Sequence, residues 1–517
     1  GVIGSLLTLL VAIKLHMMAV EGDVLAYRLG NWPAPFGIVL VLDRLSALMV
    51  LLTSVLALIV LVHAVATNWD QKGLHFHALF QFQLMGISGA FLTGDVFNLF
   101  VFFEVLLIAS YGLMIHSGGR ERMRAGLQYV IMNLAGSTLF LFALGTLYAS
   151  TGTLNIADLA VRLREIPVED AAIVRVAAML LMIVFAVKAA LFPVQFWLPG
   201  TYANAPAPVA ALFAIMTKVG AYAIIRVHTI VFGPDIPATG DMAGLWLFAA
   251  AIVTVGIGAF GVLGARRLMP LIAFSVLGSM GTLMLAISAF TPGATTAALY
   301  YLVHSTFAAA ALFLIADLVV TRRPGDTLTT LPATVQNGLF AALFFGAAIG
   351  MAGMPPLSGF LGKLFVLDNL RDPAEIGWAW TAILVGSLFT IVGFARAGSA
   401  LFWKSTAFVL PENVISDDEE KEEVPITRDP AKAWEVAPTM AAIGMLAALS
   451  IFAGPAARYF ELTADQLFDR NAYVSAVLEN PDGLKPYPDD HHGEEDAAYD
   501  EDAAGHDDDG SAKDGGH

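Results

Sequence analysis

Residues 179–200 have the sequence MLLMIVFAVKAALFPVQFWLPG, an apolar run of membrane length with one lysine, Lys188, five positions before Pro193. A bilayer core of about 30 Å is spanned by roughly 20 apolar residues in a helix. Proline removes a backbone donor and clashes with the preceding turn, so we expect this helix to break near mid-membrane. The stretch therefore predicts a membrane helix that is interrupted beside a buried lysine.

A second apolar run, residues 343–367, also combines proline with one lysine. Its sequence is LFFGAAIGMAGMPPLSGFLGKLFVL, with Lys363 seven positions after Pro356. Paired broken helices in the two halves of a transporter indicate inverted repeats around a central ion site. We therefore expect two five-helix repeats of opposite orientation, in residues 75–232 and 242–405.

The composition indicates an all-α polytopic membrane protein, because 57% of the residues are hydrophobic and 14% are charged, against roughly 25% charged in a soluble domain. Spanning β-strands are shorter and alternate in polarity. We expect about 13 transmembrane helices, which begin near residues 1, 38, 75, 95, 124, 171, 206, 242, 268, 295, 335, 377 and 434. The remaining expected parts are N-terminal helices in 1–74, an acidic cytoplasmic loop at 406–433, a last helix at 434–458 and an acidic, largely disordered tail at 459–517.

Loop charge predicts the orientation. Three basic loops follow the fourth, eighth and tenth expected spans, and they contain Arg120, Arg122 and Arg124, then Arg266 and Arg267, then Arg322 and Arg323. Short cytoplasmic loops are enriched in Lys and Arg, so these loops and Gly1 are expected inside. The acidic tail is then expected outside, and because residues 489–517 hold 12 Asp or Glu and one Lys, it should be solvated.

Five ionisable residues fall well inside expected spans. A charge at bilayer depth costs roughly 2.5 to 3.5 kcal/mol, so it usually has a partner or a function. A contact between a buried carboxylate and a buried ammonium changes how tightly each holds its proton, and histidine titrates near neutrality. The set therefore indicates a proton relay, formed by Glu104, Lys188, Lys218, His304 and Lys363.

Each of these residues also has a purely structural interpretation. Glu104 and Lys188 would form a buried structural pair, Lys218 would snorkel, His304 would bond a neighbouring serine or carbonyl, and Lys363 would anchor an unwound turn. Other charged residues are assigned structural partners. We expect Asp317 to be held by Arg322 or Arg323, Asp43 and Arg44 to form an interfacial pair, and Arg226 to snorkel.

The chain has no cysteine and no phosphate-binding loop, HExxH site or recognisable nucleophile. These absences from the sequence disfavour a catalytic enzyme and predict no cofactor or resident metal.

Five long segments resemble the MrpD-type family of the Mrp multisubunit sodium/proton antiporters. They are YRLGNWPAPFGIVLVLDRLSALM (27–49), TGDVFNLFVFFEVLLIASYGLM (93–114), AVKAALFPVQFWLPGTYANAPAPVAALF (186–213), TKVGAYAIIR (217–226) and MPPLSGFLGKL (354–364). The chain is also similar, more distantly, to the antiporter-like subunits of respiratory complex I. The resemblance extends over residues 1–456 and implies a family fold of 14 helices, of which the first is missing here, with two inverted repeats.

The resemblance also implies roles for the buried residues. Glu104 and Lys188 correspond to a coupled pair in the first repeat, Lys218 to a middle lysine, His304 to a bridging residue, and Lys363 to a lysine on the broken helix of the second repeat. Ser279, in VLGSMGT, stands where many complex I relatives carry histidine. We expect Ser279 and Asp317 to be accessory members, and a lysine at position 363, where one complex I subunit has glutamate, favours the Mrp family.

The sequence thus predicts a proton-translocating subunit of a hetero-oligomeric monovalent cation (Na⁺)/proton antiporter. This is a secondary transporter and not an enzyme, placed in the plasma membrane of a prokaryotic cell. Its expected partners are other membrane subunits of an Mrp-type complex and the lipid bilayer, with no nucleic acid. The alternatives are a proton-pumping membrane subunit of complex I or of a membrane-bound hydrogenase, and a scaffold with inert buried pairs.

Overall fold

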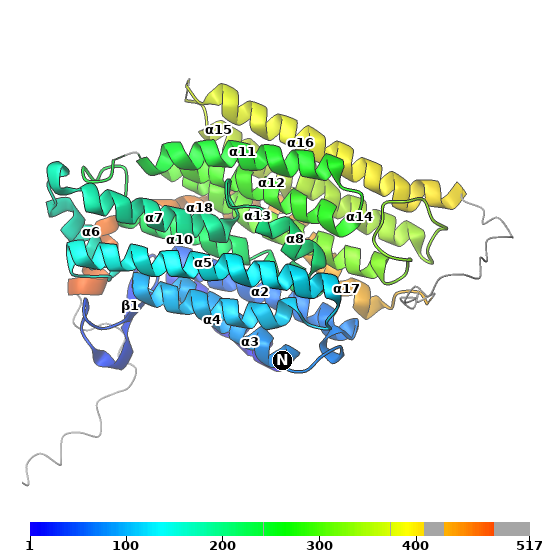
Figure 1. Ribbon diagram of the computed structural model, residues 1–517, viewed down its shortest axis with the longest axis horizontal. Helices are drawn as coiled ribbons and strands as arrows, with labels where there is room; N and C mark the ends of the chain where they lie inside the picture. Colours follow the sequence, from blue (N-terminus) through cyan, green and yellow to red (C-terminus); the bar gives the residue numbers. More distant parts are fainter. Residues whose placement is uncertain (241, 373, 408–428, 480–517) are drawn as a thin grey trace, which may run out of the picture.

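The computed structural model describes residues 1–240, 242–372, 374–407 and 429–479. Within these ranges the chain is built almost wholly of helices that run side by side along the long axis of the molecule (Figure 1). Two strands, β1 (Leu25–Arg28) and β2 (Val39–Leu42), pair as an antiparallel hairpin after the first helix. The all-α membrane fold predicted from the sequence is confirmed.

Eleven helices in the described ranges are long and apolar enough to cross a membrane. They are α1 (Val2–Val20), α2 (Arg44–Ala66), α4 (Val96–Met114), α5 (Arg120–Thr151), α7 (Ala172–Ala189), the continuous pair α9 (Ala207–Phe213) and α10 (Met216–Ile230), α11 (Met242–Gly264), α12 (Leu268–Ser288), α13 (Pro292–Val320), α16 (Ile376–Gly398) with its continuation to Thr406, and α17 (Ala433–Ile451). Two apolar helices are shorter, α3 (Phe76–Leu92) and α14 (Asn337–Ala352). Each of these helices overlaps a run from which the sequence predicted a span.

The second predicted span begins later than expected. Residues 39–42 form strand β2, and α2 begins at Arg44. Asp43 caps this helix, because its carboxylate accepts from the Ser46 backbone N–H at 2.8 Å, while the Ser46 hydroxyl accepts from the Asp43 N–H at 2.9 Å. This reciprocal capping box satisfies two backbone donors at the start of the helix.

Both helices that the sequence predicted to break at a proline are interrupted. Helix α7 ends at Ala189 and is followed by α8 (Trp197–Asn204), and α14 ends at Ala352 and is followed by α15 (Ser358–Asn369). At the second break Gly353 has a φ of +80°, a left-handed conformation that glycine adopts without steric cost. The breaks leave backbone carbonyls at the ends of α7 and α14 free to bind side chains.

The most buried helices lie between the two halves of the chain. All residues of α9 and α10 are buried, and so are nearly all of α13. Helix α13 packs against α2, α9, α12, α14, α15 and α17. In Figure 1, α10 and α13 lie inside, with α4 and α5 towards one edge and α11 and α16 towards the other.

The three basic loops meet at one end of the bundle. The Arg267 guanidinium lies 2.7 Å from Asp326 and 3.7 Å from Glu121, which joins the loop after α11 to the loops around α5 and α13. The backbone of Leu268 also donates to Asp326 O at 2.7 Å. The three loops therefore lie on one face, as the count of spans predicted.

The chain after residue 459 differs from the expected tail as far as Glu479. Residues there continue α18 (Ala453–Phe468) and form α19 (Arg470–Val474), and Phe460 and Leu467 are buried. Apolar residues spaced along one face of α18 explain this packing. Residues 480–517 and 408–428, which include most of the expected tail and acidic loop, lie outside the described residues.

The remaining α-helix, α6 (Ile156–Glu165), follows α5.

Candidate functional site

The five ionisable residues singled out in the sequence lie on five different helices. Glu104 is on α4, Lys188 on α7, Lys218 on α10, His304 on α13 and Lys363 on α15. Lys218 and His304 are fully buried, and Lys188 and Lys363 are 7% and 9% exposed. Glu104 is only half-buried.

Glu104 and Lys188 are linked through a third helix. Within the described residues they form no direct ion pair; the Ser137 hydroxyl donates to Glu104 Oε1, and Lys188 Nζ donates to Asn133 Oδ1 at 3.0 Å. Asn133 and Ser137 lie one turn apart on α5, so they share a helix face. The expected acid–base pair is therefore bridged by two neutral polar side chains.

Asn133 and Ser137 were not identified from the sequence. A signal was present, because both lie in the apolar run YVIMNLAGSTLF with the four-residue spacing that places them on one side of a helix. The Asn133 side-chain nitrogen also donates to Tyr129 O at 2.8 Å. This second bond orients the amide so that its oxygen faces Lys188.

Aromatic rings enclose Lys188 on its other side. Its Nζ lies 5.6 Å from the centre of the Phe103 ring, and Phe103 is packed edge-on against Phe140 and Phe185. A cation over an aromatic face is attracted by the ring quadrupole. The ammonium is thus held between one amide oxygen and one ring.

Lys218 has no hydrogen-bond partner for its ammonium within the described part of the chain. It lies near the start of α10, just after the junction with α9. Helix α10 approaches the broken end of α7 closely, because a Cβ added at Gly220 would lie 2.6 Å from the backbone nitrogen of Ala189 and 2.9 Å from the carbonyl carbon of Lys188. The helices that carry Lys218 and Lys188 therefore touch at this point.

His304 is bonded through its Nδ1. This nitrogen lies 2.9 Å from the hydroxyl oxygen of Ser358, the first residue of α15, whereas Nε2 makes no hydrogen bond of ordinary geometry among the described residues and the Gly350 backbone faces the ring. A Cβ at Gly359 would lie 2.9 Å from that Nε2, so the imidazole packs against the first turn of α15. This serine was not singled out in the sequence.

Lys363 turns back into the helix break. Its Nζ donates to Ala352 O at 2.9 Å, to the Ser387 hydroxyl at 2.8 Å and, at a longer 3.5 Å, to Met351 O. The two carbonyls belong to the last turn of α14, where the break leaves them without a helical donor. Lys363 therefore anchors the unwound segment, as its structural interpretation supposed.

Ser279 belongs to a small cavity next to Lys363. Its hydroxyl donates to the Tyr301 hydroxyl at 3.2 Å. The cavity has a volume of about 20 Å³. Its polar lining consists of Ser275, Ser279, Thr282, Tyr301, Lys363, Ser387 and Thr390.

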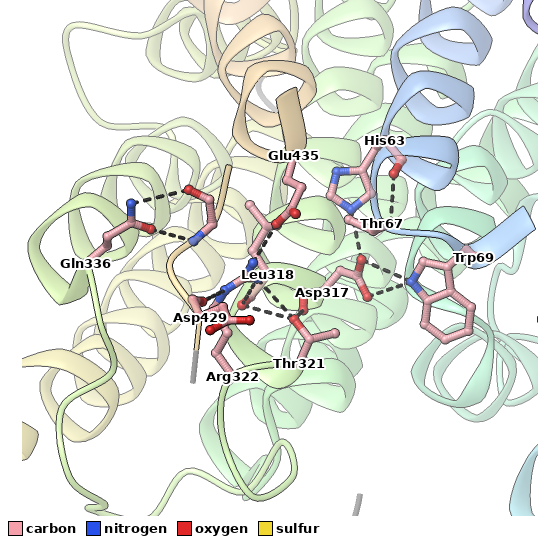
Figure 2. Close-up of polar contacts among 11 residues, drawn as sticks. His63, Thr67, Trp69, Asp317, Leu318, Thr321, Arg322, Gln336, Asp429 and Glu435 are labelled. Carbon is pink, nitrogen blue, oxygen red and sulfur yellow. Dashed lines mark hydrogen bonds and ion pairs between the residues drawn. The ribbon is translucent and has the colours of Figure 1, made fainter. Parts of the chain in front are cut away.

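Asp317 has different partners from those predicted. Figure 2 shows its carboxylate bonded to His63 Nε2 at 2.9 Å and to Trp69 Nε1 at 2.9 and 3.1 Å. Arg322 instead bonds Glu435 at 2.5 Å, and Arg323 donates to Leu401 O and Thr329 O. The prediction was wrong because both arginines lie beyond the end of α13, where the chain turns away from Asp317.

Asp317 also lines a large cavity at the basic face. This cavity has a volume of about 480 Å³, and Trp69, Arg122, Arg267 and Asp326 are among its other lining residues. Lys72, in the loop before α3, lies 3.5 Å over the Trp69 ring. Burial lowers the pKa of Lys72, and this effect is opposed by Asp317 and reinforced by Arg122. The lining of the cavity thus contains charges of both signs.

Two further structural expectations were wrong. Arg226 does not snorkel but is 2% exposed, and it forms an ion pair with Asp43. Arg44, the expected partner of Asp43, donates instead to Val20 O at 3.0 Å. In the described residues, no group of three or more His, Cys, Asp or Glu is arranged to hold a metal ion.

Comparisons with known proteins place these features in a family. Residues 93–390 match the family described as "NADH:quinone oxidoreductase/Mrp antiporter, TM". The D subunit of a probable K⁺/H⁺ antiporter from Rhizobium meliloti is 40% identical over 486 residues, covering 88% of this chain and 86% of that protein. The D subunit of a Na⁺/H⁺ antiporter from Alkalihalophilus pseudofirmus is 37% identical over 487 residues, covering 91% and 92%. A chain of the Mrp complex from Dietzia sp. superposes with a TM-score of 0.81 at 29% identity, covering 92% of this chain and 93% of that chain. The protein therefore belongs to the NADH:quinone oxidoreductase/Mrp antiporter family of membrane proteins.

Proposed function

We propose that this chain is the proton-translocating subunit of a hetero-oligomeric monovalent cation/proton antiporter. Similarity over most of its length to D subunits named for Na⁺/H⁺ and K⁺/H⁺ antiport supports this function. The observation that carries it is Lys218, a fully buried lysine whose ammonium has no acceptor in the described protein. An unpaired buried charge is costly, so such a residue is retained where the side chain must gain and lose a proton.

The proposed relay follows the order of the helices. The first part joins Glu104 to Lys188 through Ser137 and Asn133 on α5, which supply a donor and an acceptor between the two charges. The close approach of α7 and α10 at Gly220 supports transfer onward to Lys218.

The second part of the relay runs from His304 to Lys363. The Nε2 of His304 can accept or donate a proton, and it lies against the turn of α15 that precedes Lys363. Protons enter by a half-channel near Lys188 and Lys218, pass His304 and leave through Lys363, or move in the reverse direction.

The proposed arrangement in the membrane follows from the loops and breaks. The face with Arg120, Arg267 and Arg322 is cytoplasmic, and the acidic tail is outside. Residues 75–232 and 242–405 are the two inverted repeats, an assignment supported by one proline-containing break in each. Transport is secondary, so the chain carries out no covalent chemistry, and exposed apolar faces on α1, α5 and α16 fit lipid and other membrane subunits.

Substitution of the first acid and the middle lysine tests this function. Glu104→Ala and Lys218→Ala should abolish proton-coupled Na⁺ or K⁺ movement in membrane vesicles while the complex still assembles. Thr138→Ala is the matched control, because Thr138 is an exposed neighbour of Ser137 whose hydroxyl bonds its own helix at Leu134 O. Full exchange in both relay variants would refute the relay.

A second candidate is a proton-pumping membrane subunit of an oxidoreductase such as complex I or a membrane-bound hydrogenase. The matching family supports this second candidate, because its description names NADH:quinone oxidoreductases together with Mrp antiporters. Purification of the assembled complex distinguishes the two. Accompanying proteins with flavin and iron–sulfur clusters support the oxidoreductase, and small membrane partners without cofactors support the antiporter.

A further inference from the structure

The ammonium of Lys363 occupies a cage of oxygen atoms. Two of them are main-chain carbonyls at the end of α14, Met351 O and Ala352 O, and the third is the hydroxyl of Ser387 on α16. Carbonyl and hydroxyl oxygens are also the ligands that replace the hydration shell of a monovalent cation in membrane proteins. The Lys363 ammonium therefore occupies a group of oxygen atoms that could also coordinate a free monovalent cation.

The cage opens into the small cavity described above. Further hydroxyls of Ser279, Thr282 and Tyr301 face the same space. A volume of about 20 Å³ is enough for one water-sized particle. A single dehydrated Na⁺ or K⁺ is of about this size.

The cage offers partial negative charge but no full negative charge. The titratable side chains that face Lys363 are Tyr301 and His304, both on α13; the remaining lining residues, from α11, α12, α14 and α16, are uncharged. No carboxylate pairs with Lys363 in the described residues. The negative end of the α14 dipole points at the cage, so the site stabilises one cation and repels a second.

We propose that this oxygen cage binds the transported Na⁺ or K⁺, and that the cation and the protonated Lys363 exclude one another. This inference rests on the proposed antiporter function and adds the place where the two fluxes meet. The ammonium passes its proton to the relay at His304, and the neutral amine keeps its lone pair. A cation then enters with one positive charge, so the charge of the cage is the same before and after the exchange.

Equilibrium binding of radioactive Na⁺ to the purified, assembled complex tests the exclusion, with Rb⁺ as the probe for K⁺. In the unmodified complex, binding of one of these cations should rise from acidic to alkaline pH. Lys363→Gln removes the tethered charge but keeps a polar side chain, so binding should persist and lose this pH dependence. The inference is overturned if neither cation binds, or if Lys363→Gln leaves the pH dependence unchanged.

A second pair of variants tests the cage itself. Ser387→Ala removes one oxygen ligand and should raise the cation concentration for half-saturation by about 5- to 10-fold, the effect of losing one polar contact. Ser387→Thr keeps the hydroxyl and should stay within about 2-fold, as should the exposed control Thr138→Ala. Equal affinity in Ser387→Ala and in the unmodified complex would place the cation elsewhere.

The antiporter function and the cation site at Lys363 are tested by separate measurements. If vesicles with the unmodified complex show no cation/proton exchange, the proposed function fails. If they exchange normally but the binding experiments give the contrary results above, only the cage at Lys363 is wrong.

Discussion

Lys188 donates its hydrogen bond to Asn133 and not to Glu104, over a distance of 3.0 Å. The carboxylate of Glu104 is bonded one turn further along α5, by Ser137. A direct contact would let a proton pass in one step and would also lock the two charges together. The bridging helix keeps the two charges apart. In the proposed relay, each residue can then change its protonation state while the other keeps a hydrogen-bond partner.

Asn133→Leu should therefore slow transport without preventing assembly. Leucine has a similar size but no acceptor, so Lys188 loses its oxygen partner and the step to Glu104 is broken. We expect a loss of about 10-fold or more in the rate of exchange, which corresponds to a barrier raised by about 1.4 kcal/mol. The measurement is cation-driven proton movement in vesicles containing equal amounts of complex.

Two comparisons accompany this prediction. Asn133→Gln keeps an amide and should retain more activity than Asn133→Leu, and Thr138→Ala on the exposed side of α5 should behave like the unmodified chain. Unchanged exchange in Asn133→Leu would mean that protons reach Lys188 by another path.

The cluster around Asp317 makes a prediction about stability. A double-mutant cycle between Asp317→Ala and His63→Ala should give a coupling of about 1 to 3 kcal/mol, because each change leaves a buried partner unsatisfied. The same cycle between Asp317→Ala and Arg322→Ala should give less than about 0.5 kcal/mol, because the Asp317 carboxylate and the Arg322 guanidinium share no hydrogen bond; Thr321 links Arg322 only to the Asp317 backbone carbonyl, which the substitution keeps. Unfolding by denaturant in detergent measures both free energies.

The two cycles distinguish His63, the partner of Asp317 in the structure, from Arg322, the partner expected from the sequence. Coupling of Asp317 to Arg322 equal to its coupling to His63 would contradict the contacts in Figure 2.

The contrast between Asp317 and Lys188 shows where sequence reasoning succeeds. Apolar runs and prolines act locally, so the helices, the two breaks and the burial of Lys188 and Lys218 could be predicted from the sequence. Partners are set by contacts between helices that are separated along the sequence, such as α2 with α13 or α5 with α7. No local pattern connects His63 with Asp317, which are 254 residues apart, and the same limit explains why Ser358 was overlooked.

The buried ion pair between Asp43 and Arg226 should be essential for folding. Asp43→Leu leaves the Arg226 guanidinium buried and unpaired, which typically costs about 3 to 5 kcal/mol. The double variant Asp43→Leu with Arg226→Met should recover much of this loss, since an apolar pair avoids the unpaired charge. The thermal midpoint of the purified complex is the measurement.

An exposed ion pair supplies the control for this prediction. Arg371 and Asp368 lie at the surface, with side chains that are 65% and 58% exposed. Arg371→Ala should change stability by less than about 1 kcal/mol. If Arg226 instead extended its charge to water, Asp43→Leu would lower the stability by as little as Arg371→Ala does.

The contact between α7 and α10 should be sensitive to a single methyl group. A Cβ at Gly220 would lie 2.6 Å from the Ala189 nitrogen, and a backbone contact of that kind cannot be relieved by a side-chain rotation. Gly220→Ala must therefore push α10 away from the broken end of α7, which separates Lys218 from Lys188. We expect exchange to fall at least about 10-fold, since an ångström-scale displacement in a relay or active site has effects of this size or more.

Gly256 on α11 is the matched control, because a Cβ added there meets no described atom within 4 Å. Gly256→Ala should keep full exchange and gain slightly in helix stability, by up to about 1 kcal/mol. Both variants add one methyl group to an apolar helix, so a general effect of alanine on insertion would appear in both. A loss confined to Gly220→Ala, with the complex still assembled, would show that transport depends on the distance between the helices of Lys188 and Lys218. Equal activity in the two variants would mean that protons do not cross between α7 and α10.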